Sequence, residues 1–212
     1  MSDVLIPGGR DVRGTLEEPA GGDESDTEAI VVACPPHPQH GGSRTDGRLV
    51  AVADALTDAG IACLRFDYGP WDEGHGERAD VRNALAWAAE EYDRVGLFGY
   101  SFGATLSLLA AVDVQSESGL EVAFEAVSVL APTAQLGADD DLDAHAALAE
   151  LDRPLQVCHG ERDTTVDWEP IVERARDRGA EIHPLPADHF FLGTQPEIAD
   201  AVRDFFEGHL LE

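Results

Sequence analysis

Lysine is missing from this sequence of 212 residues: all 14 of its basic side chains are arginine, and they face 42 aspartate and glutamate residues. The formal net charge is therefore −28 at pH 7. A nucleic acid or an anionic membrane binds surfaces of the opposite sign, because its phosphates must be neutralised by cations. The composition therefore argues against nucleic-acid and membrane partners.

The excess of acid is spread over the whole chain instead of being confined to a tail. Charge of this size destabilises a compact protein at low salt through self-repulsion. At about 1 M salt the Debye length falls to about 3 Å, and most of that repulsion is screened. The composition resembles that of halophile proteins that work in a cytoplasm of molar salt.

Long hydrophobic runs are also missing. No apolar stretch reaches the roughly 18 residues of a membrane-spanning helix, and the N-terminal "MSDVLIPGGR" lacks the apolar centre of a secretory signal. The three cysteines, Cys34, Cys63 and Cys158, are an odd number and each ends an apolar run. We therefore expect buried free thiols in a reducing cytoplasm, and no disulfide framework.

What is present is a regular alternation of strand and helix patterns. Two short segments, "DVLIP" and "DVRGTLEEP", indicate an antiparallel pair, and a polar loop follows at 17–28. Strands are then predicted at 29–34, 61–67, 94–100, 124–132, 154–160 and 180–186, and helices at 46–60, 77–92, 102–112, 169–179 and 195–210. The pattern predicts one α/β domain over residues 1–212, with a mostly parallel sheet of about seven to eight strands and helices on both faces.

A serine lies between two glycines in "GYSFG", where the strand at 94–100 passes into the next helix. In a strand–turn–helix context this motif is typical of a nucleophile on a sharp turn, with the glycines at 99 and 103 avoiding collisions. The alternative is a small-residue turn without chemistry. The start of the helix also brings backbone N–H groups beside the Ser101 hydroxyl.

A serine needs a base, and the base needs an acid to orient it. Asp163 follows the strand at 154–160 in "HGERD", and His189 follows the last strand in "ADHFF". The order serine, aspartate, histidine is the one expected for this strand–turn–helix motif. Asp167 is a competing acid, which we expect instead to cap the helix that begins near Trp168 or Glu169.

The pieces "GYSFG", "GERD", "ADHFF" and the loop "CPPHPQHGGS" resemble the α/β-hydrolase family over nearly the whole chain, in particular small members without a cap, such as dienelactone hydrolases and short carboxylesterases. The resemblance implies that Ser101 is the nucleophile, His189 the general base and Asp163 its orienting acid. It departs from the family at Pro35, where such loops often carry a histidine. About twenty residues join the strands that end near Pro132 and begin near Pro154, which leaves room for one short helix and no lid domain.

An oxyanion hole needs two backbone N–H groups, and the first is predicted to come from Phe102. The second should come from the loop at 34–43, where three prolines lack an N–H, so that His37 or Gln39 remains and His37 is favoured. The predicted apolar pocket consists of Tyr100, Trp71, Phe190 and Phe191.

Other polar groups are weaker candidates. The pairs His37 with His40 and His75 with Glu77 could ligate a metal, but neither makes a four-ligand set, and we predict no metal and no cofactor. Asp67 is expected to hold its own loop. The acidic run at 139–141 is expected to be a solvated loop.

The sequence therefore predicts a serine hydrolase that cleaves a carboxylic ester or thioester through an acyl-enzyme on Ser101. The alternatives are a small peptidase or amidase with the same residues, and a non-catalytic binding protein on the same fold. The expected partner is a small ester-like molecule, and the expected state is a monomer or weak homo-oligomer. The sequence does not identify the substrate.

Overall fold

A computed structural model describes residues 1–20, 28–116, 122–137 and 142–211. Most of the predicted polar loop and the acidic run at 139–141 lie outside these ranges. The strands are β1 (Ser2–Ile6), β2 (Val12–Glu17), β3 (Ala29–Cys34), β4 (Ala62–Asp67), β5 (Arg94–Tyr100), β6 (Ala126–Leu130), β7 (Leu155–Gly160) and β8 (Glu181–Leu185). The helices are α1 (Gly47–Asp58), α2 (His75–Glu91), α3 (Phe102–Ser116), α4 (Ala144–Ala147), α5 (Glu169–Asp177) and α6 (Gln195–Leu210), with a short 3₁₀ turn at Pro38–His40.

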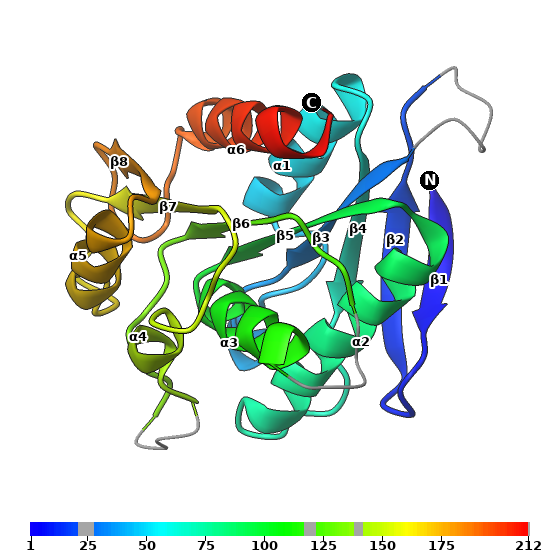
Figure 1. Cartoon of the computed structure of the whole chain (residues 1–212), viewed down its shortest axis with the longest axis horizontal. Coiled ribbons are helices and arrows are strands. Elements are labelled where there is room, and N and C mark those ends of the chain that lie inside the picture. Colours follow the sequence, from blue (N-terminus) through cyan, green and yellow to red (C-terminus); the bar gives the residue numbers. More distant parts are fainter. Residues whose placement is uncertain (21–27, 117–121, 138–141, 212) are drawn as a thin grey trace.

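The eight strands form one sheet in the order β1-β2-β4-β3-β5-β6-β7-β8 (Figure 1). β1 and β2 are antiparallel to each other, β2 is antiparallel to β4, and all other neighbours are parallel. The central strands β3, β5 and β6 are buried almost throughout, because helices cover both of their faces. The predicted mostly parallel sheet of about seven to eight strands, with helices on both faces, is confirmed.

Two hydrophobic cores lie on opposite faces of the sheet. Helices α1 and α6 pack together on one face, and α2, α3, α4 and α5 cover the other (Figure 1). Helix α3 continues to Ser116, beyond the predicted end at 112, because Val114 is buried and Asp113 accepts a hydrogen bond from Arg78 of α2 at 2.7 Å. The three cysteines are buried free thiols, as predicted.

The carboxyl ends of the parallel strands meet at one edge of the sheet, where α/β proteins bind their ligands. Residues 131–154 join β6 to β7; their described part, 131–137 and 142–154, contains one short helix, α4, and the whole connection is too short to form a lid domain. The edge around the ends of β5, β7 and β8 is therefore left open to solvent. No helix in the described ranges has both the length and the apolar character needed to cross a membrane.

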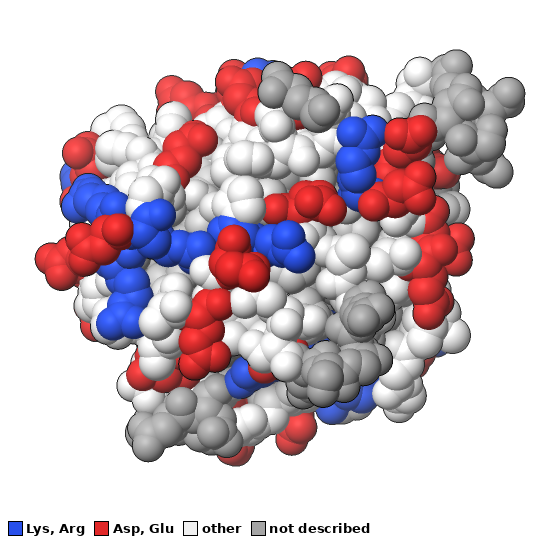
Figure 2. Space-filling model, in the orientation of Figure 1, with Lys and Arg blue, Asp and Glu red and all other residues white. Residues whose placement is uncertain are grey.

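Acidic side chains are spread over the face drawn in Figure 2, with arginines between them. Several arginines are paired across the fold: Arg10 with Asp80 at 2.8 Å and Arg65 with Glu17 at 2.9 Å. Because 14 cations cannot compensate 42 acids, repulsion among the acids outweighs the attraction within these pairs, and added salt should relieve more repulsion than it removes attraction.

We expect the melting temperature to rise by about 10 °C or more between low salt and about 1 M KCl, measured by circular dichroism. If screening is the cause, most of the rise occurs below about 1 M, where the Debye length is already about 3 Å. A rise that continues undiminished at higher salt indicates salting-out of apolar surface instead. A melting temperature independent of KCl contradicts the halophile interpretation.

Candidate active site

Ser101 occupies the sharp turn between β5 and α3. Its backbone has φ of 56°, a left-handed conformation that non-glycine residues rarely adopt. A Cβ on Gly99 would lie 2.4 Å from the Gly103 carbonyl oxygen, and one on Gly103 would lie 2.4 Å from the Cys34 and Pro35 carbonyl oxygens. Both glycines are therefore required by backbone contacts, and the turn projects the serine from the edge of the sheet.

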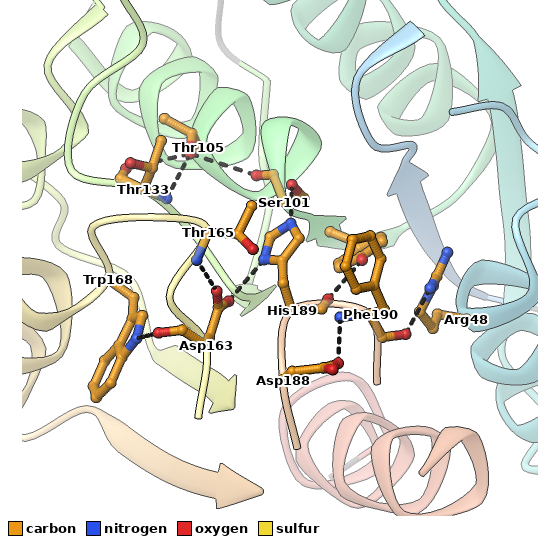
Figure 3. Close-up of polar contacts among 11 residues, drawn as sticks. Arg48, Ser101, Thr105, Thr133, Asp163, Thr165, Trp168, Asp188, His189 and Phe190 are labelled. Carbon is orange, nitrogen blue, oxygen red and sulfur yellow. Dashed lines mark hydrogen bonds and ion pairs between the residues drawn. The ribbon is translucent and has the colours of Figure 1, made fainter. Parts of the chain in front are cut away.

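The structure brings Ser101, His189 and Asp163 into one line of hydrogen bonds (Figure 3). The Ser101 Oγ lies 2.9 Å from His189 Nε2, and His189 Nδ1 lies 2.7 Å from Asp163 Oδ2. A carboxylate only accepts, so Nδ1 carries the proton and Nε2 is free to accept the serine proton. The side chains of His189 and Asp163 are 8% and 0% exposed, which excludes competing water from this pair.

The second oxygen of Asp163 is also occupied. Oδ1 accepts the backbone N–H of Thr165 at 2.8 Å, and the Asp163 carbonyl accepts the indole N–H of Trp168 at 3.0 Å (Figure 3). The carboxylate is thus fixed in the orientation that faces His189.

Asp167, the competing acid, is exposed at the surface. The prediction that it caps the following helix is wrong: the residue at the N-cap of α5 is Trp168, and no side chain makes the cap hydrogen bond. The Asp167 backbone carbonyl instead accepts the N–H of Ala134 at 2.9 Å, and so joins this loop to the residues after β6.

The hydrogen bonds of the folded chain distinguish the three N–H groups that the sequence predicts as oxyanion donors. Phe102 is the first residue of α3, so its N–H has no acceptor within the helix. In the loop after β3, Gln39 N–H donates to His37 Nδ1 at 3.3 Å, and the N–H groups of His40 and Gly42 donate to the His37 carbonyl. Within this described loop the Gln39 N–H already has an acceptor, whereas the His37 N–H donates to none. His37 is therefore favoured above Gln39 as the second donor.

The His37 ring is held inside an aromatic cluster. Its centroid lies 4.4 Å from that of His40, 4.7 Å from that of Trp71 and 4.7 Å from that of Phe102. Burial, aided by the charge that His40 can carry, lowers the pKa of His37. The ring is therefore neutral near pH 7 and able to accept the Gln39 N–H.

A cavity of about 620 Å³ opens above Ser101. Of the four predicted pocket residues, Tyr100 and Phe190 line it and Trp71 and Phe191 do not. The Trp71 ring packs against the His37 ring with centroids 4.7 Å apart, and Phe191 is fully buried in the core shared with α1 and α6. Sequence reasoning missed several lining residues, namely Pro36, Gly41, Gly42, Asp46, Arg48, Thr133, Leu136, Thr165 and Val166. Most of them follow the carboxyl ends of β3, β6 and β7, and that position was the available signal.

The metal candidates of the sequence were two pairs, His37 with His40 and His75 with Glu77. Within the described residues no group of three or more His, Cys, Asp or Glu side chains could hold a metal ion. Glu77 is buried and accepts the N–H groups of Asp72 and Gly74, which fixes the start of α2. Asp67 was predicted to hold its own loop. It instead accepts the Arg44 N–H at 2.7 Å and so holds the loop before α1.

Sequence reasoning did not single out one buried histidine, His159. His159 of β7 is buried, stacks on Trp168 with ring centroids 4.2 Å apart, and neither ring nitrogen has a hydrogen-bond partner in the described structure. Burial first, and then the charge of Arg176, lower the pKa of His159.

A histidine whose pKa is lowered on folding contributes stability above its unfolded pKa, and this contribution is lost as the pH falls toward the folded value. Wild type should therefore lose stability between about pH 7 and pH 5, and His159→Phe should not lose this contribution. We expect the free energy of unfolding of the variant minus that of wild type to increase as the pH falls. Urea unfolding at each pH measures it. Parallel pH profiles for His159→Phe and wild type contradict the prediction.

No protein-family model matches the sequence, and the comparison with curated proteins gives no match either. Solved structures do match. An α/β serine hydrolase homologue from Coxiella burnetii is 24% identical with a TM-score of 0.76, and the match covers 96% of each chain. A serine hydrolase without a lid from Xanthomonas campestris is 22% identical with a TM-score of 0.77, covering 100% of this chain and 95% of that one. A butyrate-bound esterase from Thermogutta terrifontis is 16% identical with a TM-score of 0.79, covering 98% and 93%.

At these identities the likeness establishes the fold. This likeness agrees with the eight-stranded, mostly parallel sheet and with the short connection between β6 and β7. The chain has the α/β-hydrolase fold, in the form that lacks a lid.

Proposed function

We propose that this protein is a serine hydrolase that cleaves a carboxylic ester or thioester of a small molecule through an acyl-enzyme on Ser101. The observation that carries the proposal is the continuous line from Ser101 Oγ through His189 to Asp163, at 2.9 and 2.7 Å, at the floor of an open cavity. The cavity volume of about 620 Å³ is in the range that accepts small molecules.

In the first half-reaction the Ser101 Oγ attacks the substrate carbonyl carbon while its proton passes to His189 Nε2. Asp163 stabilises the imidazolium that forms. The N–H groups of Phe102 and His37 bind the oxygen that gains the negative charge, and each such donor contributes about 3–4 kcal/mol to the transition state. His189 then donates its proton to the leaving oxygen or sulfur as that bond breaks, and the acyl group stays on Ser101.

In the second half-reaction a water molecule gives a proton to His189 and attacks the acyl carbon. The same two N–H groups bind the oxyanion again. The acid leaves as the proton returns from His189 to Ser101, so that the enzyme regains its starting state.

An ester is supported by the solved structures with this fold, which include an esterase with bound butyrate from Thermogutta terrifontis and an Est1E structure from Butyrivibrio proteoclasticus with bound ferulic acid. The apolar side chains that line the cavity and are available to the acyl or alcohol part of a substrate include Tyr100, Phe190, Leu136 and Val166.

The test combines a fluorophosphonate probe with three substrates that share one butyryl group and one nitrophenyl ring: the oxygen ester, the thioester and the anilide. We expect probe incorporation at Ser101, located by peptide mass spectrometry, and turnover of the ester or thioester. Incorporation with turnover of the anilide alone identifies an amidase or peptidase. No incorporation and no turnover, in low salt and in molar KCl, leaves the non-catalytic alternative.

A further inference from the structure

The loop that carries His189 joins β8 to α6 and has no regular structure of its own. Its position depends on contacts from other elements. The Tyr100 hydroxyl, at the end of β5, donates to the His189 carbonyl at 2.8 Å. Arg48 Nη1, at the start of α1, donates to the Phe190 carbonyl at 2.8 Å (Figure 3). Two consecutive carbonyls beside the imidazole are thus held by side chains that lie far away in the sequence.

Arg48 is itself fixed on three sides. Its Nε donates to Asp46 Oδ1 at 2.8 Å, and its Nη2 pairs with Asp46 Oδ2. The guanidinium carbon lies 4.5 Å from the centre of the Tyr100 ring, within the range of a cation–π contact. The side chains of Arg48 and Asp46 are 17% and 9% exposed, so that water screens this pair little.

Asp46 links this pair to the loop that carries the His37 N–H. Its Oδ1 also accepts the Arg48 N–H at 2.9 Å and so caps α1, and its own N–H donates to the Ser43 carbonyl at 3.0 Å. The chain of contacts therefore runs from the loop after β3, through Asp46 and Arg48, to the loop of His189. Asp46 caps α1 through its carboxylate alone. The contact between the Arg48 side chain and the Phe190 carbonyl is not required for this cap.

We propose that Arg48 is a positioning residue that holds the His189 imidazole in line with Ser101. The expected change in kcat rests on the proposed function, whereas the positioning of His189 rests on the geometry alone. The planar guanidinium reaches Asp46 and the Phe190 carbonyl at the same time through separate nitrogens, whereas lysine carries all its donors on a single nitrogen. The shape of the group, and not its charge alone, is therefore what the site uses.

The test compares Arg48→Met and Arg48→Lys with wild type on the ester substrate. A misplacement of a catalytic group by about 1 Å can lower the rate about a hundredfold. We therefore expect kcat of Arg48→Met to fall about 10- to 100-fold, with KM changed less than about threefold. Arg48→Lys keeps the charge and should recover only part of the loss. Arg203→Met is the matched control: it makes the same charge change on α6, where Arg203 pairs with Asp200 and Asp204, and should leave kcat unchanged.

A second readout does not depend on turnover. The proton on His189 Nδ1, hydrogen-bonded to Asp163, gives a downfield proton resonance, assigned by its loss in His189→Gln. We expect this resonance to broaden or shift in Arg48→Met and to stay unchanged in Arg203→Met. If wild type turns over no substrate but the resonance responds in this way, the proposed function fails and the positioning role stands.

Three results overturn the inference. One is an unchanged kcat and an unchanged resonance in Arg48→Met. The second is full recovery by Arg48→Lys, which means that a positive charge at this position is sufficient. The third is a fall in kcat that equals the loss of folded protein measured by circular dichroism, which means that Arg48 only stabilises α1.

Discussion

Ser101→Ala should lower kcat for the ester by about 10⁶ while the fold stays intact. The change removes one hydroxyl, and with it the only atom that can form the acyl-enzyme in the proposed mechanism. Alanine and serine both carry a Cβ, so the substitution adds no new steric clash at φ of 56°. The rate is measured by stopped-assay hydrolysis at high enzyme concentration, and the fold by circular dichroism at the same salt concentration.

The matched control for this variant is Ser116→Ala. Ser116 is exposed at the far end of the same helix, α3, and its hydroxyl lies away from the cavity. It should keep the parent rate. Turnover in Ser101→Ala within about tenfold of wild type would end the assignment of the nucleophile, since no other group in the proposed mechanism can replace the lost hydroxyl.

Asp163→Asn should lower kcat by about 10⁴ with little change in the melting temperature. Asparagine has the same shape, but its amide can donate where the carboxylate only accepts. It therefore favours the tautomer of His189 in which Nε2 carries the proton and cannot take one from Ser101. The Thr165 N–H, which Asp163 Oδ1 accepts at 2.8 Å, can still be accepted by the amide oxygen, so the loop has a partner in both proteins.

Asp167→Asn is the matched control, because it makes the same chemical change four residues later in the same loop. Its side chain is exposed and its structural contact is made by the backbone carbonyl, which the substitution leaves in place. Its kcat should stay within a few fold of wild type. Both variants are assayed in the same molar salt, so that the change in net charge does not enter the comparison. A crippled Asp167→Asn beside an active Asp163→Asn would transfer the orienting role to Asp167.

The sequence by itself determined the alternation of strands and helices and the place of Ser101 between them. Continuous apolar runs such as 29–34 and the 3.6-residue periodicity of 195–210 are local patterns, and the structure has β3 and α6 at those bounds. The serine turn was readable from its glycines: a Cβ on Gly99 would meet the Gly103 carbonyl within the turn itself, whereas the clash at Gly103 is with the Cys34 and Pro35 carbonyls of a distant segment. The order of Ser101, Asp163 and His189 followed from their places after strands of one parallel sheet.

Only the tertiary structure decided which neighbouring side chain faces the cavity. Phe190 and Phe191 are adjacent and chemically identical, yet one lines the cavity and the other is fully buried, because the turn of the chain at Phe191, with φ of 49°, directs it into the core. Likewise His37 and Gln39 differ as N–H donors only through the hydrogen bonds of the folded loop.

The contact between Arg48 and the Phe190 carbonyl joins residues 142 positions apart. No local periodicity or turn preference encodes such a pair. It exists because α1 and α6 pack on the same face of the sheet and bring the start of one helix beside the loop that precedes the other. Short motifs therefore predicted the candidate catalytic residues. The contacts that position these residues depend on packing between distant segments, which local sequence patterns do not predict.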